Sequence, residues 1–250
     1  MRPIQILRDP VTTDPALDTA VSRTLLLDVA AGKIPESFRI FSPNRNVAFG
    51  RQDRPRTGYP AAVRAVTDLG FIPVERLAGG KAAVFHEDTL SFSWAIPDPS
   101  PQDRIHVRFE EIASIITEAL RSLGVDARVG EVPGEYCPGD YSVNAGGSRK
   151  LMGVGQRLVR GAAHIGGVIV VADPDLVNRP LIPAYRHLEY DWDPATTGAV
   201  ADHAPATTAG VAEAVLAELG RRYELQRGSI GPDLVARSVE LAAEHRPSIA

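Results

Sequence analysis

The sequence predicts an α+β fold with a mainly antiparallel sheet and helices packed against it. Short segments typical of strands follow one another across glycine turns, most clearly over residues 141–171. Amphipathic helical segments lie before and after that region rather than between successive strands. A chain of 250 residues that is 44% hydrophobic can bury a large core without disulfides or metals. We therefore expect residues 1–250 to form a single domain.

Capping residues and helical periodicity locate the first helix. Asp14 is a candidate N-cap, Pro15 falls in the first turn, and apolar residues keep helical spacing as far as Gly32. Glycine and proline turn signals divide the next eighty residues. These signals predict a helix over 60–69 and strands over 38–41, 47–49, 71–75, 82–86 and 90–96.

The clearest helical period covers residues 107–123, which carry regularly spaced isoleucines and leucines and end at Gly124. Strand-like segments over 141–144, 151–158 and 164–171 follow, separated by glycine turns. The pattern predicts two consecutive antiparallel hairpins packed on the 107–123 helix. Residues 172–206 are rich in Pro, Asp and Thr and are predicted to be irregular, and two amphipathic helices, 208–223 and 232–245, close the chain.

Composition excludes several classes of protein. A net charge of −4 argues against a nucleic-acid partner, and the longest apolar run, 165–172, is too short to cross a bilayer. A single cysteine cannot form an intrachain disulfide, which favours a reducing compartment, and we expect a cytoplasmic protein. The spacing of His, Cys, Asp and Glu does not match a zinc site, so we expect no metal.

Lysine is rare, and each of two lysines follows a glycine pair. Only three of the 27 basic residues are lysines: Lys33, Lys81 and Lys150. Arg76 and Lys81 flank Gly79-Gly80, where backbone N–H groups can approach an anion or a carbonyl without a Cβ in the way. The structural alternative is a glycine hairpin with solvated basic residues at its ends.

Lys150 opens a strand that contains Gly153 and Gly155. Glycine weakens a strand unless a ligand or another backbone must come close, and these two glycines lie on one face. Lys150 and Gly153 are an odd number of residues apart, so a bulge or twist is needed to bring them together. The alternative is a bend in the sheet with an exposed lysine at its end.

Cys137 lies in a Pro-Gly turn just before a strand, rather than within an apolar run. A thiol at the edge of a loop can be a nucleophile where a nearby cation favours its thiolate form, and Lys150 is the candidate cation. The alternative is an inert cysteine that fills space beside Tyr141.

Taken in order, these segments resemble the biotin/lipoate protein ligase and octanoyltransferase superfamily over roughly residues 14–172. Arg76-x-x-Gly79-Gly80…Val84-Phe85-His86 is similar to the lipoate-ligase stretch RRxxGGxxVYHD. Lys150-x-x-Gly153-x-Gly155-Gln156 is similar to the family's G-x-K-x-x-G-x-A-Q segment, and residues 47–52 resemble its V-x-x-G-R-x-Q turn. Cys137-Pro138-Gly139-x-Tyr141 is most similar to the lipoyl amidotransferases, whereas ATP-dependent ligases carry an Asn-Asp pair near this point.

The resemblance implies that Cys137 takes an octanoyl or lipoyl group from a carrier-protein thioester and passes it to a lysine of a lipoyl domain. Lys150 is the second catalytic residue, and N–H groups of the glycine-rich segments would stabilise the oxyanion. Substrate-binding roles are implied for eight residues: Arg76, Gly79, Gly80, His86, Asp140, Gly153, Gly155 and Gln156. One cleft must hold all of these groups, so Gly79 and Gly80 are expected near Lys150.

The implied donor is acyl carrier protein or a carrier like the glycine cleavage H protein. The implied acceptors are the lipoyl domains of 2-oxoacid dehydrogenases, and no cofactor is required. Two other functions stay open on the sequence. One is an ATP- and Mg-dependent lipoate–protein ligase that uses free lipoate or octanoate through Lys150 and Asp140. The other is a non-catalytic protein that binds a lipoylated carrier or a biotin-like acid.

Overall fold

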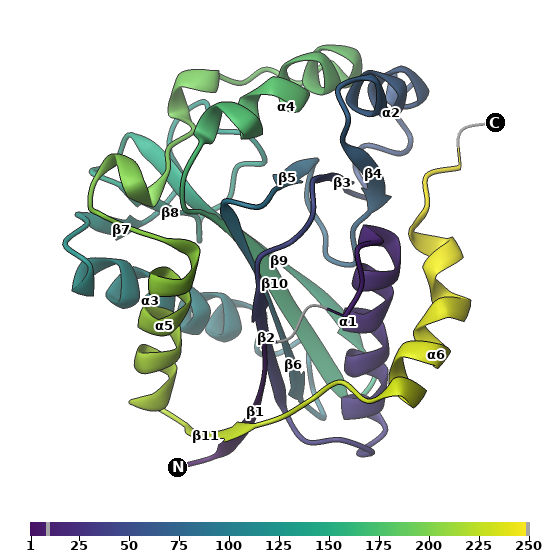
Figure 1. Ribbon diagram of the computed structural model, residues 1–250, viewed down its shortest axis with the longest axis vertical. Coiled ribbons are helices and arrows are strands. Elements are labelled where there is room, and N and C mark those ends of the chain that lie inside the picture. The colour runs from purple at the N-terminus through teal and green to yellow at the C-terminus, as the bar shows by residue number, and fades with distance from the viewer. Residues whose placement is uncertain (9–10, 249–250) are drawn as a thin grey trace.

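The structure is a computed structural model that describes residues 1–8 and 11–248. An eight-stranded sheet runs through the molecule in the order β11-β1-β2-β6-β10-β9-β8-β7, as Figure 1 shows. Its strands are β1 (Pro3–Leu7), β2 (Ser37–Phe41), β6 (Thr89–Pro97), β7 (Ala127–Val129), β8 (Val143–Ala145), β9 (Arg149–Val159), β10 (Ala162–Val170) and β11 (Glu224–Arg227). A second, three-stranded sheet has the order β4-β3-β5, from β3 (Asn46–Phe49), β4 (Ile72–Glu75) and β5 (Ala83–Phe85).

The strand pairing confirms the predicted α+β class with a mainly antiparallel sheet. In the large sheet every neighbouring pair from β2 to β7 is antiparallel, and only β1 pairs in parallel, with β2 and with β11. In the small sheet β3 pairs in parallel with β4 and antiparallel with β5. The parallel pairs β1–β2 and β3–β4 are each joined through a helix, whereas β1 and β11 come from opposite ends of the chain.

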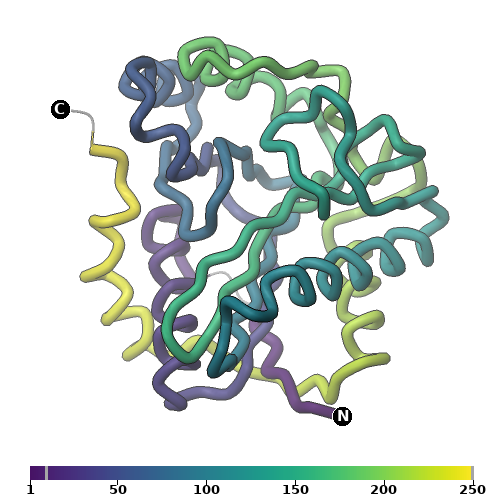
Figure 2. The backbone as a smooth tube through the Cα atoms, turned by 180° about the vertical axis from the view of Figure 1, so that it is seen from behind, coloured from purple at the N-terminus to yellow at the C-terminus, as the bar shows by residue number. Residues whose placement is uncertain are grey.

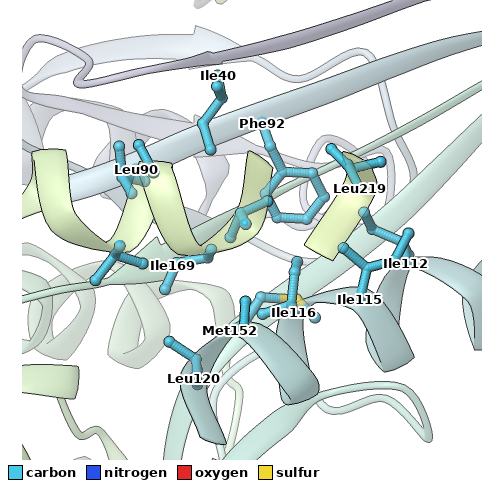
Figure 3. Close-up of a cluster of buried hydrophobic side chains, with 14 of the residues drawn as sticks. Ile40, Leu90, Phe92, Ile112, Ile115, Ile116, Leu120, Met152, Ile169 and Leu219 are labelled. Carbon is cyan, nitrogen blue, oxygen red and sulfur yellow. The ribbon is translucent and has the colours of Figure 1, made fainter. Parts of the chain in front are cut away.

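Two helices, α3 (Ile105–Ser122) and α5 (Thr208–Gly220), cover one face of the large sheet. Alternate residues of β6 point to this face and meet the helices in the main core. Figure 3 shows Phe92 of β6 and Met152 of β9 among Ile112, Ile115 and Ile116 of α3. The periodic apolar residues of the 107–123 segment are therefore the face that the predicted helix buries.

The opposite face and the small sheet carry the other helices. Helix α1 (Pro15–Ala30) packs its Leu26 and Val29 against Ala95 and Ala162 of the large sheet, and α6 (Pro232–Ala242) packs on α1. Helices α2 (Tyr59–Asp68) and α4 (Pro174–Leu188) share a separate core with the small sheet (Figure 1). Three short 3-10 turns complete the chain: η1 (Pro194–Thr196), η2 (Val200–Asp202) and η3 (Ala243–His245).

The two predicted hairpins are present, and they lie beside α3 (Figure 2). The first joins β8 to β9, and the second joins β9 to β10 in regular register. Between β8 and β9 the register shifts: Val143 pairs with Met152, but Asn144 pairs with Lys150. Leu151 is therefore an extra residue, and this bulge is the irregularity that the spacing of Lys150 and Gly153 required.

The prediction that residues 172–206 are irregular is wrong, because α4 fills much of that segment. Pro180 and Pro183 lie inside this helix and hide its pattern, since proline normally breaks a helix. The Asp173 side chain accepts from the Leu176 N–H, and burial of the apolar face against α2 and β5 holds the helix. The short strands β1, β7 and β11 were also missed. Within the described residues, none of the helices is both long and apolar enough for a membrane span.

Candidate active site

Cys137 lies on the loop between β7 and β8 in a left-handed backbone conformation, with φ 41°. Residues with a side chain rarely adopt this conformation, so the surroundings must hold it. The Cys137 N–H donates to the Tyr185 hydroxyl at 3.0 Å, and that hydroxyl donates to the Ala82 carbonyl at 2.9 Å. Lys150 Nζ donates to the Cys137 carbonyl at 2.8 Å. The peptide groups on both sides of Cys137 are thus anchored to other elements.

The Cys137 thiol is half-buried and points at the glycine-rich loop between β4 and β5. Its Sγ accepts from the Lys81 backbone N–H at 3.2 Å and lies 3.9 Å from Arg76 Nη1. Arg76 is itself fixed by donating to the Lys81 carbonyl at 2.8 Å. A backbone N–H and a guanidinium both favour a negative sulfur. The cation within contact of the thiol is therefore Arg76, whereas Lys150 contacts the Cys137 carbonyl.

Lys150 is buried, with 1% of its surface exposed, so the alternative of an exposed lysine at the end of a bent sheet is wrong. Its Nζ donates to Glu135 Oε1 at 2.8 Å, to the Tyr136 carbonyl at 2.9 Å and to the Cys137 carbonyl. These three acceptors use all three N–H groups of an ammonium. Lys150 therefore ties β9 to the loop that carries the thiol.

Glu135 completes this arrangement, although it was not among the site residues predicted from the sequence. Its Oε1 also accepts from the Ser142 hydroxyl at 2.6 Å and the Gly139 N–H at 3.2 Å, and its Oε2 accepts from the Val132 N–H at 3.0 Å. One buried carboxylate thus closes the loop over residues 132–142 and neutralises Lys150. The available signal was an acidic residue two positions before the only cysteine.

The two strand glycines allow the close approaches that the sequence predicted. A Cβ on Gly153 would lie 3.3 Å from Lys150 Cε, so the Lys150 side chain packs against Gly153. A Cβ on Gly155 would lie 2.9 Å from both Arg76 Nη2 and the Gly79 carbonyl. The Gly79 N–H donates to the Gln156 carbonyl, so it is occupied, and Lys81 supplies the N–H that faces the sulfur.

A cavity of about 520 Å³ brings nine of the ten predicted site residues together. Its lining includes Cys137, Lys150, Arg76, Gly79, Gly80, Asp140, Gly153, Gly155 and Gln156. Asp140 is exposed on the loop that carries Cys137. The Gln156 side-chain amide accepts from Arg108 and donates to the Ile105 carbonyl. His86 is the exception, because it is fully buried and does not line this cavity.

A second cavity of about 110 Å³ adjoins the first, and both are lined by Arg76, Phe85 and Gly167. Phe41 and Phe92 are among its apolar lining residues, and Ser22 and His164 add polar groups. Burial and the nearby charge of Arg76 lower the pKa of His164 to about 4. His164 is therefore neutral at physiological pH. Across the described residues, His, Cys, Asp and Glu form no cluster that could hold a metal ion.

The comparisons with known proteins agree with this geometry. The family model "Lipoyl protein ligase A/B catalytic domain" matches residues 14–191, which is most of the chain. The chain belongs to the lipoyl protein ligase A/B catalytic domain family. The matched region contains every residue predicted for the site, from Arg76 to Gln156.

Proteins that are similar to this chain in sequence include transferases. An octanoyl-GcvH:protein N-octanoyltransferase of Bacillus velezensis is 28% identical over 85% of this chain and 76% of its own length. One from Geobacillus kaustophilus is 27% identical over 80% and 70%. Octanoyltransferase LipM of Moorella thermoacetica is 26% identical over 66% and 64%.

Solved structures show that the whole fold is shared within the family. A T. acidophilum lipoate protein ligase with bound lipoic acid has a TM-score of 0.77 and 18% identity, over 97% of this chain and 95% of that one. A lipoate-protein ligase A bound with ATP has a TM-score of 0.74 and 18% identity, over 97% and 94%. At these identities the structures establish the fold alone.

Tyr185→Phe is expected to lower acyl transfer about tenfold while the protein stays folded. The change removes one hydroxyl and with it the contacts to the Cys137 N–H and the Ala82 carbonyl. A hydrogen bond of this kind contributes about 1 kcal/mol to stability, and the left-handed cysteine loses its anchor. Tyr190→Phe, which removes a hydroxyl bonded to the Gln52 carbonyl, is the matched control for transfer rate and urea unfolding. Equal effects of the two changes would contradict the anchoring role.

Stability is expected to fall as the pH drops from 7.5 to 5, partly through His164. Its pKa is about 4 in the fold against an ordinary value of 6.5, so the unfolded chain takes up the proton first. This difference in pKa lowers the free energy of unfolding by about 2 kcal/mol between pH 7.5 and pH 5. Burial lowers the pKa of His86 and His245 in the same direction. Urea unfolding of His164→Gln at both pH values should show a smaller loss than the wild type, and an equal loss would refute this.

Proposed function

We propose that the protein is an octanoyl or lipoyl transferase that carries the acyl group on Cys137. The observation that carries the proposal is the position of Cys137, the only cysteine in the sequence. It is held in a strained left-handed conformation with its sulfur in the 520 Å³ cavity. An inert cysteine needs neither the anchors on both of its peptide groups nor the Arg76 and Lys81 contacts. The names of the relatives support the same assignment.

In the first half-reaction the Cys137 thiolate attacks the acyl carbonyl of the donor carrier. The new bond is S–C, the bond to the carrier's leaving atom breaks, and the leaving atom takes the proton released by the thiol. Arg76 and the Lys81 N–H stabilise the thiolate before attack. Once the sulfur is acylated, the Lys81 N–H is free to face the developing oxyanion, a contribution worth roughly 3 kcal/mol where it has been measured.

In the second half-reaction a lysine amine of the acceptor attacks the thioester. The N–C bond forms, the S–C bond to Cys137 breaks and returns the thiolate, and the amine must lose a proton. Lys150 has no free lone pair in this state, because its N–H groups are all donated. It can accept that proton only after passing its own to Glu135 Oε1, which lies 2.8 Å away. The buried Lys150–Glu135 pair is therefore proposed to act as one unit in proton transfer.

The acyl tail is proposed to enter the smaller cavity beside the nucleophile. Phe41, Phe85 and Phe92 give it apolar walls, as a saturated chain requires. His164 is neutral and therefore does not add a buried charge to those walls. Arg76 stands where the two cavities meet, which places the acyl carbonyl near Cys137 while the tail points away from it.

The donor is proposed to be a carrier like the glycine cleavage H protein or an acyl carrier protein, and the acceptors are lipoyl domains of 2-oxoacid dehydrogenases. The relatives named for transfer from GcvH favour the H protein, and one related ligase structure includes its E2 lipoyl domain. No cofactor is proposed, since the acyl group passes from carrier to Cys137 to acceptor and is never a free acid that needs activation. We propose that residues 1–250 act as one catalytic domain in the reducing cytoplasm.

The test is transfer from purified octanoyl-H protein or octanoyl-acyl carrier protein to an apo lipoyl domain, followed by the mass of the acceptor. Transfer is expected without ATP. Modification that occurs only with free octanoate, ATP and Mg would replace the proposal by the ligase function, with Asp140 and Lys150 as its site. Ligand binding without any turnover would favour the non-catalytic alternative.

A further inference from the structure

A third cavity, of about 130 Å³, shares Arg76 with the cavity of Cys137 and has five arginines in its lining. Five stretches of the chain form it: α1, the turn after β3, the end of β4, β9 and η3. The arginines that line it are Arg23, Arg51, Arg54, Arg76 and Arg157. Only Arg76 among them also lines the cavity of Cys137.

The positive charge of this cavity is only partly balanced by the two carboxylates in its lining, Glu75 and Glu244. Arg23 pairs with Glu244 at 2.8 Å and Arg54 with Glu75 at 3.1 Å. Over residues 1–8 and 11–248, neither Arg51 nor Arg157 has a carboxylate partner. Burial and the nearby charges of Arg51 and Arg23 lower the pKa of Arg157. Arg157 is half-buried and Arg51 is exposed, and guanidinium groups that repel one another across a cavity are stabilised by a bound anion.

A buried histidine gives a second, independent indication. His245 is 5% exposed, lines this cavity and has no partner for Nε2 among the described residues. Its other nitrogen, Nδ1, donates to the Glu75 carbonyl at 2.7 Å, which fixes the ring. Buried polar atoms are normally satisfied, so an orphan in a cavity of arginines marks a place for a polar ligand.

We propose that this cavity binds a small oxyanion, either a phosphate ion or the phosphate group of a larger molecule. Guanidinium groups suit phosphate because each presents several N–H donors in a planar fork. Arg51 and Arg157 are the proposed ligands, since neither has a carboxylate to give up. Burial lowers the pKa of His245, and its Nε2 can donate to the oxyanion only when the ring takes up a proton, which a bound anion favours. The inference rests on this cavity alone and holds whether or not the acyl-transfer function is correct.

The test is titration of the full-length protein with inorganic phosphate by isothermal calorimetry, at constant ionic strength set by chloride. Saturable binding at one site is expected for the wild type. The double variant Arg51→Ser/Arg157→Ser should bind at least tenfold more weakly, because it lacks two charged donors. The matched control is Arg160→Ser/Arg179→Ser, which loses the same charge at exposed positions outside the cavity.

Circular dichroism and urea unfolding establish that each variant is folded before its titration. No saturable binding to the wild type, or equal weakening by both double variants, would overturn the proposal. Coenzyme A and pantetheine, which is the same arm without the phosphates and the adenosine, distinguish the two sources of the phosphate. Tighter binding of coenzyme A that is lost in Arg51→Ser/Arg157→Ser identifies the phosphate of a larger molecule. Equal binding of the two, with phosphate itself bound, identifies the free ion.

Discussion

Cys137→Ser is expected to abolish octanoyl transfer, with a loss of roughly 10³-fold or more. Serine keeps the backbone and almost the same volume, so the left-handed loop and its contacts to Tyr185 and Lys150 should persist. A hydroxyl is hardly ionised at neutral pH, and Arg76 with one backbone N–H cannot replace a general base. The measurement is the rate of acceptor modification by mass spectrometry.

The wild type gives the complementary result. Incubation with an octanoyl carrier, without acceptor and without ATP, should leave an octanoyl adduct on Cys137. The adduct should disappear when an apo lipoyl domain is added, at a rate that matches turnover. A serine variant that retains full, ATP-dependent activity would instead establish the ligase function and leave Cys137 without a catalytic role.

Lys150→Ala is expected to lose both activity and stability, whereas an exposed lysine at a strand start could be removed with little loss of stability. Removing Lys150 leaves the Glu135 carboxylate buried without a counter-charge, and breaking a buried ion pair in this way costs about 3–5 kcal/mol. It also leaves the Tyr136 and Cys137 carbonyls without their donor. Urea unfolding should show the lower stability directly, beside the loss of transfer.

A double variant separates the chemical role of Lys150 from its structural role. Lys150→Met/Glu135→Gln removes both charges and nearly preserves both volumes, so its stability should recover to within about 1–2 kcal/mol of the wild type. Transfer should remain at least about 10²-fold slower, because the pair can no longer accept the proton of the acceptor amine. A stable double variant with wild-type activity would show that the pair only holds the loop in place.

Local sequence patterns predicted the elements whose own residues carry the signal. The 107–123 period became α3 because its apolar stripe packs on the large sheet, and the glycine turns set the two hairpins. Helix α4 could not be predicted, because Pro180 and Pro183 contradict the local rule and only packing against α2 and β5 stabilises it. Strands β1 and β11 are short and pair with each other across most of the chain.

The candidate site divides in the same way. The sequence by itself determined which segments meet, since the residues of the Gly79-Gly80, Cys137 and Lys150 segments line one cavity. Only the tertiary structure decided what each group contacts. The bulge at Leu151 turns Lys150 inward onto Glu135, and the thiol faces Arg76 and the Lys81 N–H instead of Lys150. Residue type and spacing select the chemistry, but burial and hydrogen-bond partners come from segments far apart in sequence, which meet only when the chain folds.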